Sequence, residues 1–154
     1  MSQTRILTLR VSRITRETPE ILGLELTHPW GRPLPPYEAG AHVDVHLPGG
    51  FSRQYSLAQA PHVAGHRYVI GVKREAASRG GSASIHSRVR EGDLLPVAEP
   101  RNTFTLAEGA AHHLLVAGGI GMTPLLAMAQ TLAARGQRFT LCVFARSPEH
   151  LAFA

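Results

Sequence analysis

The 154-residue chain has few of the features that mark several large classes of protein. It contains one cysteine, so it can form no internal disulfide and no all-cysteine metal site. No stretch approaches the roughly 18 consecutive apolar residues that a membrane helix needs. The first ten residues alternate polar and apolar side chains instead of forming the apolar run of a signal peptide. We therefore expect a cytoplasmic location and no membrane partner.

Aromatic residues are also scarce, and basic residues are dispersed. Phe, Trp and Tyr make up 6% of the chain, while its formal net charge is +5. The arginines stand singly rather than in runs, and no aromatic platform for base stacking lies among them. The same charge suits phosphate-bearing cofactors and acidic protein partners. We expect no nucleic-acid binding.

Short strands separated by turn residues fill the first two thirds of the sequence. We expect strands at 7–16, 20–27, 42–47, 53–57, 67–73, 93–98 and 102–106, and a short helix over 82–90. Residues 28–40 hold four prolines and two glycines, a composition typical of a loop. This succession predicts a small antiparallel β-barrel over residues 1–107.

Residues 108–154 have a different pattern. His113–Ala117 is a continuous apolar strand, as in a parallel sheet buried on both faces. A glycine-rich turn follows, then a helix over 123–135, a second strand over 139–144 and the start of another helix at Pro148. This is the opening of a doubly wound α/β domain that then stops. Its open sheet edge predicts aggregation or a dimer.

His42, Asp44 and His46 are candidate metal ligands by residue type. They stand at every second position of a strand and therefore share one face, opposite Val43 and Val45. Alternation between solvent and core explains this pattern fully. We expect a solvated strand face and no metal site.

Arg53-Gln54-Tyr55-Ser56-Leu57 places a guanidinium, an aromatic ring and a hydroxyl side by side at the end of a strand. A flavin requires all three. Its phosphate suits the bidentate fork of an arginine, its ring system suits an aromatic wall, and its N5 edge suits a short hydrogen-bond donor. The same residues are also common on strand surfaces.

Gly80-Gly81-Ser82 precedes the predicted helix over 82–90. Glycines allow backbone N–H groups to converge on an anion, and a helix N-terminus adds positive potential. The alternative is a flexible turn followed by a serine N-cap. The presence of Arg53 favours a flavin phosphate here.

Gly118-Gly119-Ile120-Gly121-Met122-Thr123-Pro124 follows a buried strand and opens a helix, the context that a dinucleotide site requires. It is not a true G-x-G-x-x-G motif. The end of the next strand carries Arg146 and Ser147 instead of an acidic residue.

The order of these three motifs resembles that of the ferredoxin–NADP reductase superfamily. Val72-Lys73-Arg74-Glu75 and Pro100-Arg101-Asn102-Thr103-Phe104 are similar to the phthalate dioxygenase reductase branch, which includes vanillate demethylase reductases. The resemblance covers essentially the whole chain. It implies a ferredoxin reductase-like, flavin-binding barrel at 1–107 and a partial NAD(P)-binding domain at 108–154.

The resemblance also implies roles for single residues. Arg53 would bind the flavin phosphate, Tyr55 would pack along the flavin, and Ser56 would face N5. The full set of flavin-binding residues is Arg53, Gln54, Tyr55, Ser56, Val72, Lys73, Gly80, Gly81, Ser82 and Ser84. The phthalate dioxygenase reductase branch uses FMN and many relatives use FAD, so FMN is favoured and FAD stays open.

For the nicotinamide nucleotide, the resemblance implies contacts with Gly118, Gly119 and Gly121. Thr123 would lie beside the nicotinamide and, with Ser56, at the catalytic centre. Arg146 would contact the adenosine ribose or its phosphate, with a solvated strand end as the alternative. NADH and NADPH both remain possible.

The implied activity is that of an oxidoreductase that passes hydride from NAD(P)H to the flavin and then single electrons to an iron–sulfur domain and an oxygenase partner. In this branch a C-terminal C-x4-C-x2-C domain holds the cluster, and this chain lacks it. Cys142 lies in an apolar strand and is expected to be a core residue. A flavin-binding module without turnover is the alternative, and a basic interaction domain is a third.

Overall fold

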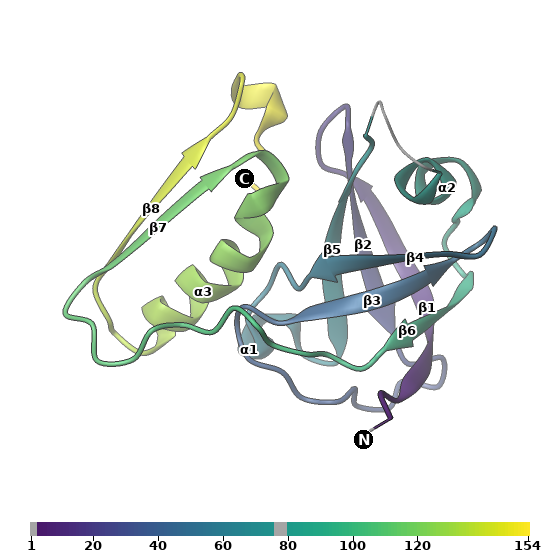
Figure 1. Ribbon diagram of the computed structural model, residues 1–154, viewed down its shortest axis with the longest axis horizontal. Helices are drawn as coiled ribbons and strands as arrows, with labels where there is room; N and C mark the ends of the chain where they lie inside the picture. The colour runs from purple at the N-terminus through teal and green to yellow at the C-terminus, as the bar shows by residue number, and fades with distance from the viewer. Residues whose placement is uncertain (1–2, 76–79) are drawn as a thin grey trace.

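The computed structural model describes residues 3–75 and 80–154. Alternating apolar side chains in the first part of the chain build a six-stranded antiparallel barrel, and a smaller α/β lobe lies beside it (Figure 1). The barrel contains β1 (Ile6–Arg16), β2 (Ile21–Thr27), β3 (His42–Leu47), β4 (Phe51–Ser56), β5 (Arg67–Lys73) and β6 (Leu94–Ala98), with α1 (Pro61–Ala64) and α2 (Gly81–Arg88) between strands. The predicted barrel is confirmed.

The strand order of the barrel is β4-β3-β6-β1-β2-β5. β4 and β5 are therefore the two ends of the sheet, and one bridge between Leu57 and Ile70 joins them. The inward-facing side chains, such as Leu9, Leu24 and Val45, are fully buried. The barrel is thus nearly closed, and its opening lies between β4 and β5.

The face of β3 that carries His42, Asp44 and His46 is less solvated than the sequence predicts. His42 is 7% exposed, and its backbone pairs with that of Arg101 in both directions. Burial, with Arg101 nearby, lowers the pKa of His42. Asp44 and His46 are half-buried. Within residues 3–75 and 80–154, no group of three His, Cys, Asp or Glu side chains could hold a metal ion.

The strand predicted at 102–106 is wrong. The side chain of Asn102 donates a hydrogen bond to the carbonyl of Ala39 (3.1 Å) and accepts one from the amide of Phe104 (3.0 Å). These two side-chain bonds, one to a distant loop and one within the segment, replace the ladder that a strand would form. The segment therefore turns toward the loop before β3.

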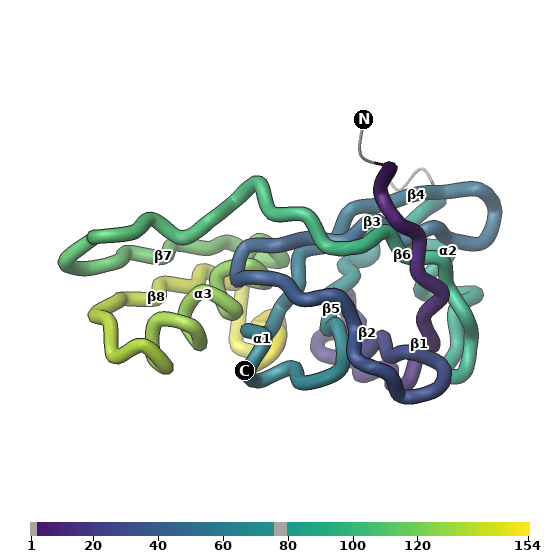
Figure 2. The backbone as a smooth tube through the Cα atoms, turned by 90° about the horizontal axis from the view of Figure 1, so that it is seen from below, coloured from purple at the N-terminus to yellow at the C-terminus, as the bar shows by residue number. Residues whose placement is uncertain are grey.

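The α/β lobe consists of β7 (His113–Gly118), a 3₁₀ turn η1 (Gly119–Gly121), α3 (Met122–Ala134), β8 (Phe139–Phe144) and a second 3₁₀ turn η2 (Pro148–His150). β7 and β8 pair in parallel, from His113 opposite Phe139 to Gly118 opposite Phe144. Figure 2 shows this lobe extending to one side of the barrel. The helix predicted from Pro148 onward is wrong, since only η2 forms and the chain then turns back to the barrel.

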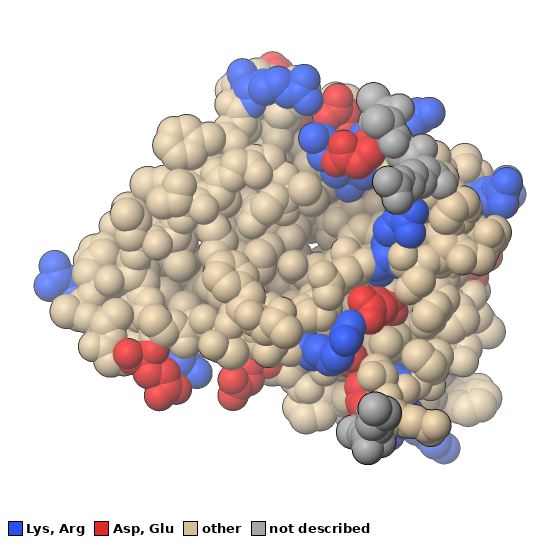
Figure 3. Space-filling model, in the orientation of Figure 1, with Lys and Arg blue, Asp and Glu red and all other residues tan. Residues whose placement is uncertain are grey.

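α3 covers one face of the β7–β8 sheet and leaves the other open. Leu115 and Ala117 are buried, whereas the alternate residues Leu114 and Val116 are 66% and 56% exposed. The expectation of burial on both faces is thus wrong for this structure. Figure 3 shows few charged atoms over this lobe. No helix of the described residues is long and apolar enough to cross a membrane.

Gly40 lies where the loop before β3 packs against the segment that leads into the α/β lobe, and its substitution tests this contact. Its φ is +98°, and a Cβ there would lie 1.8 Å from the carbonyl oxygen of Phe104 and 3.0 Å from Cε of Met128 in α3. We expect Gly40→Ala to lower the free energy of unfolding by at least about 3 kcal/mol, from positive-φ strain plus steric overlap.

Gly31→Ala is the matched control, because Gly31 also has positive φ (+71°) but has no atom within 4 Å of a built Cβ. It should cost about 1–2 kcal/mol. Urea unfolding measures both. If Gly40→Ala and Gly31→Ala lose the same free energy of unfolding, the contact with Phe104 adds no cost at position 40.

Candidate functional site between the barrel and the α/β lobe

A cavity of about 630 Å³ lies where the opening between β4 and β5 meets α2 and the turn after β7. Figure 3 shows the surface hollowed between the two lobes. The lining residues are Arg53, Gln54, Tyr55, Ser56, Gly71, Lys73, Glu75, Ser82, Ile120, Gly121, Thr123 and Pro124. Segments that are far apart in the sequence, and that carry all three predicted motifs, therefore face one space.

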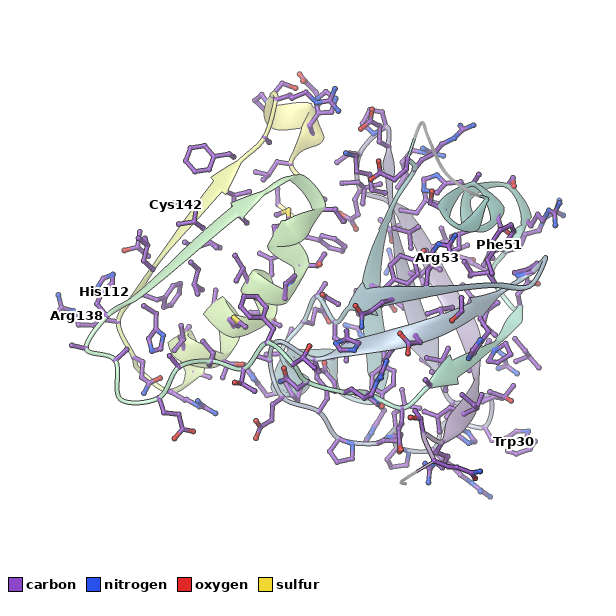
Figure 4. All side chains as sticks on the ribbon, viewed as in Figure 1. Trp30, Phe51, Arg53, His112, Arg138 and Cys142 are labelled. Atoms are coloured by element: carbon purple, nitrogen blue, oxygen red, sulfur yellow. The ribbon has the colours of Figure 1, made fainter. Side chains whose placement is uncertain are left out.

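Arg53 lies against the start of α2. A Cβ built on Gly81 would be 2.7 Å from Nε of Arg53, so a larger residue at 81 would displace this side chain. The guanidinium donates to the carbonyl of Ser52 (2.8 Å) and lies 5.5 Å from the ring centroid of Phe51. Figure 4 shows Arg53 and Phe51 together beside α2. The close approach forms a cradle beside a helix N-terminus.

Gly80 and Gly81 form the beginning of α2. Gly80 is the N-cap residue with φ of +107°, and a Cβ there would lie 2.5 Å from Cζ of Phe51. The alternative of a serine N-cap is wrong, because Ser82 is inside the helix. Ser82 lines the cavity and accepts a hydrogen bond from the amide of Glu75 (3.2 Å).

The side chains of two predicted site residues point away from the cavity, although for Val72 the resemblance implies backbone contacts only. Ser84 is buried, and its hydroxyl donates to the carbonyl of Pro48 (3.0 Å). The side chain of Val72 is fully buried in the barrel core, and its carbonyl pairs with Nε2 of His86 (2.9 Å). The next residue, Lys73, lines the cavity and lies 4.0 Å from the carboxylate of Glu75.

Tyr55 and Thr123 stand on two different walls. Tyr55 on β4 is half-buried, and burial raises the pKa of its phenol to about 12. Thr123 at the start of α3 is 5% exposed and donates its hydroxyl to the carbonyl of Ile120 (3.2 Å). The cavity is thus bounded by a barrel wall and by the turn of the other lobe.

A second cavity of about 180 Å³ lies beside the first, and Gly119, Glu20 and Arg146 are among its lining residues. The guanidinium of Arg146 pairs with the carboxylate of Glu20 across the two lobes (3.1 Å). Arg146 therefore pairs with a residue of the barrel, and its contact with a nucleotide stays a prediction. The pair is largely exposed (70% and 40%), so it stabilises the fold only slightly. Gly118 lines neither cavity.

Sequence reasoning missed Gly71, Glu75, Ile120 and Pro124 in the lining. Gly71 had a usable signal, since a lone glycine inside an apolar strand marks a place where something approaches the backbone closely. It also missed Glu20 as the partner of Arg146. No local pattern indicates a contact between residues so far apart in the sequence.

Comparison with known proteins places this geometry in context. No family model matches the chain. It is 54% identical over 134 residues to vanillate O-demethylase oxidoreductase of a Pseudomonas species, covering 87% of this chain and 42% of that protein. It is 46% identical over 148 residues to phthalate dioxygenase reductase of Burkholderia cepacia, covering 96% of this chain and 46% of that one.

The solved structure of phthalate dioxygenase reductase superimposes with a TM-score of 0.92 at 46% identity, over 96% of this chain and 46% of that one. This chain is homologous to part of these oxygenase reductases. The predicted resemblance and the ferredoxin reductase-like fold are confirmed. A flavohaemoglobin-like FAD/NAD-binding domain of nitric oxide dioxygenase from Vibrio cholerae also matches, with a TM-score of 0.85 at 27% identity, over 96% of this chain and 66% of that one.

The chain spans less than half the length of the two curated reductases it matches. The division of the sequence after residue 107 and the roles of individual site residues therefore stay predictions.

The buried phenols predict an alkaline loss of stability. Burial raises the pKa of Tyr37 and of Tyr55 from 10.0 to about 12, and also raises that of Tyr68. The folded chain then holds these protons more tightly than the unfolded chain. The protonated phenols contribute fully to the free energy of unfolding below pH 10.0, and this contribution is lost as the pH rises to about 12.

We expect urea midpoints to fall over this range, with little tyrosinate absorbance in the folded protein at pH 10. Because these three are the only tyrosines, the absorbance signal has no other source. Full tyrosinate absorbance near pH 10 in folded protein would contradict the buried environment.

Proposed function

We propose that the cavity between the lobes binds a flavin, with FMN favoured, and that the chain takes part in electron transfer from NAD(P)H through this flavin. The observation that carries the proposal is the passage of Arg53 over the bare backbone of Gly81, at one end of a cavity lined by Tyr55, Ser56 and Thr123. The cation and the helix N-terminus suit the phosphate of a flavin, and the aromatic wall suits its ribityl chain and ring.

Positive charge favours phosphate binding at the Arg53 end of the cavity. A guanidinium at a helix start provides charge-assisted hydrogen bonds together with the positive end of the helix dipole. Ser82 adds a polar side chain at the same end of the cavity. Arg53 would hold the phosphate, with the N–H groups around Gly80 and Gly81 beside it.

The shape and polarity of the barrel wall favour binding of the flavin ring at the other end of the cavity. Tyr55 and Ser56 from β4 and Lys73 from β5 line the wall of the barrel. The buried phenol of Tyr55 stays neutral at physiological pH, since its pKa is about 12. Tyr55 would pack along the flavin, and Ser56 would face its N5 edge. FAD is the second candidate, because an FAD/NAD-binding domain has a similar structure.

The turn after β7 forms the opposite wall, which supports a role in receiving the nicotinamide. Ile120, Gly121 and Thr123 line the same cavity as Tyr55 and Ser56. A bound flavin accepts two electrons as hydride and releases them one at a time. This chain would hold the nicotinamide, as hydride donor, against the flavin and would exclude water from the cavity.

The electron acceptor would be an iron–sulfur domain and, beyond it, an oxygenase. The similar phthalate dioxygenase reductase is described as a modular structure for electron transfer from pyridine nucleotides to [2Fe-2S]. This chain has one cysteine, Cys142, so it offers no set of cluster ligands itself. A cytoplasmic setting is part of the proposal, since a chain with one cysteine needs no oxidising compartment.

A flavin-binding module without turnover is the alternative, and the two-stranded α/β lobe favours it. A sheet of two strands provides little surface for the adenosine half of a nicotinamide nucleotide. Anaerobic mixing of the FMN-loaded chain with NADH and with NADPH decides between the two: bleaching of the flavin supports transfer, and retained colour supports the module.

Replacing Arg53 tests the phosphate site. We expect Arg53→Ala to weaken FMN binding about 10- to 100-fold, because charge-assisted hydrogen bonds contribute about 1.5–3 kcal/mol. Arg13→Ala, at an exposed position of β1, changes the net charge equally and should leave the FMN affinity unchanged. Titration of flavin fluorescence measures the Kd of each variant.

Riboflavin sharpens this test because it has no phosphate. Its affinity should be the same in the parent chain and in Arg53→Ala. If riboflavin weakens as much as FMN, Arg53 acts on the fold or on the ring rather than on the phosphate. If the parent chain binds neither FMN nor FAD, the proposed function is wrong.

The ion pair between Glu20 and Arg146 gives a prediction for the nucleotide. If Arg146 contacts the nucleotide, binding competes with Glu20, and Glu20→Gln should lower the KM for NAD(P)H about two- to fivefold, as expected for an exposed pair of 0.2–1 kcal/mol. The kcat should stay the same. Glu108→Gln makes the same charge change at an exposed position and serves as the control. If the KM for NAD(P)H rises in Glu20→Gln, then Glu20 itself makes a favourable contact with the nucleotide.

A further inference from the structure

Two glycines form a bare patch on the outside of the barrel. Gly23 on β2 and Gly71 on β5 are direct partners in the register of the two strands. Both interrupt strands that are otherwise rich in large apolar residues. We call Gly23 and Gly71 the glycine patch. A glycine in a strand weakens it, so a pair of facing glycines indicates that something must approach the backbone there.

The glycine patch receives side chains from the α/β lobe. A Cβ built on Gly71 would lie 2.9 Å from Cδ1 of Ile120, 3.0 Å from Cε2 of Phe153 and 3.2 Å from Cγ2 of Thr123. A Cβ built on Gly23 would lie 3.0 Å from Oε1 of Glu17, in the barrel, and 3.4 Å from Cε1 of Phe153. The ring of Phe153 therefore lies across both glycines, next to two residues of the turn that lines the main cavity.

Phe153 is held in this place by its backbone. Among the residues that the structure describes, it is the one residue other than glycine with a positive φ, of 57°. Such a conformation is strained in a residue other than glycine and persists where surrounding contacts enforce it. Its amide donates to the carboxylate of Glu17 in the barrel (3.1 Å), and its neighbour Ala152 is fully buried.

The contact joins the two walls of the main cavity. Gly71 itself lines that cavity, as do Ile120 and Thr123. The ring of Phe153 occupies the same layer between β5 and the α/β lobe as these two side chains. A smaller side chain at 153 would let the lobe settle or rock against the barrel, and the turn that carries Thr123 would move with it.

We propose that Phe153 is a positioning residue that sets the distance between the turn at 118–123 and the barrel wall. In terms of the proposed function, on which this inference rests, that distance is the approach of the nicotinamide to the flavin. Hydride transfer requires the reacting atoms at about 3–3.5 Å, and a misplacement of about 1 Å can slow such a reaction roughly a hundredfold.

The spacing of the lobes is measurable without any cofactor. Trp30 is the one tryptophan and Cys142 the one cysteine of the chain. Trp30 lies in an exposed loop of the barrel and Cys142 on β8 of the other lobe, at opposite sides of the molecule (Figure 4). Energy transfer from Trp30 to a dansyl-type label on Cys142 in the flavin-free chain therefore reports the distance between the lobes.

We expect Phe153→Ala to shift or broaden the distribution of this distance, whereas Phe153→Leu should lie between Phe153→Ala and the parent chain. Leu94→Ala is the control, because it truncates a large apolar side chain that is 53% exposed on β6 of the barrel. Circular dichroism identifies variants that fail to fold. If energy transfer in folded Phe153→Ala equals that of the parent and the control, the proposal is overturned.

The second arm is functional. In the FMN-loaded chain at saturating NADH, Phe153→Ala should slow flavin reduction at least tenfold, while the Kd for FMN and the rate of reduction by dithionite stay within twofold. A changed lobe distance with an unchanged reduction rate would contradict the positioning role. If the parent chain binds FMN but NADH does not reduce it, hydride transfer fails as a function, and the energy-transfer arm alone decides whether Phe153 sets the spacing.

Discussion

Close approach of side chains to bare backbone is the constraint on which the rest of the structure depends. Gly81 lets Arg53 pass along the start of α2, and Gly71 admits Ile120, Thr123 and Phe153 to the barrel wall. Gly40 admits the segment around Phe104, which leads into the α/β lobe. A methyl group at any of these positions would meet atoms nearer than 3 Å. The cavity exists because the two lobes meet through these contacts while the opening between β4 and β5 stays uncovered.

Much of this arrangement was predictable from the sequence because it follows from local patterns of residues. Alternation of apolar residues gave the six barrel strands, and the apolar run at His113 followed by glycines gave the strand and turn of the second lobe. Eight of the predicted site residues line the cavity: Arg53, Gln54, Tyr55, Ser56, Lys73, Ser82, Gly121 and Thr123. They were found because residue chemistry and motif order are features of the sequence itself.

The errors occur where distant segments override local preference. The segment at 102–106 has strand-like residues, but Asn102 bonds to the loop at Ala39 and turns the chain. The segment after Pro148 begins as a helix would, yet the amide of Phe153 bonds to Glu17 in the barrel. Ser84 has the right residue type for a phosphate site, but the pitch of α2 aims its hydroxyl at Pro48. None of these outcomes follows from a window of neighbouring residues.

The central claim is that the cavity between the two lobes holds a flavin. Amide hydrogen exchange with and without FMN tests it most directly, because exchange reports local protection along the whole chain. The account predicts slower exchange on adding FMN in three barrel segments, 53–56, 71–73 and 80–82, and also in the turn at 120–124. No change in exchange, or protection that is confined to other parts of the chain, would contradict it.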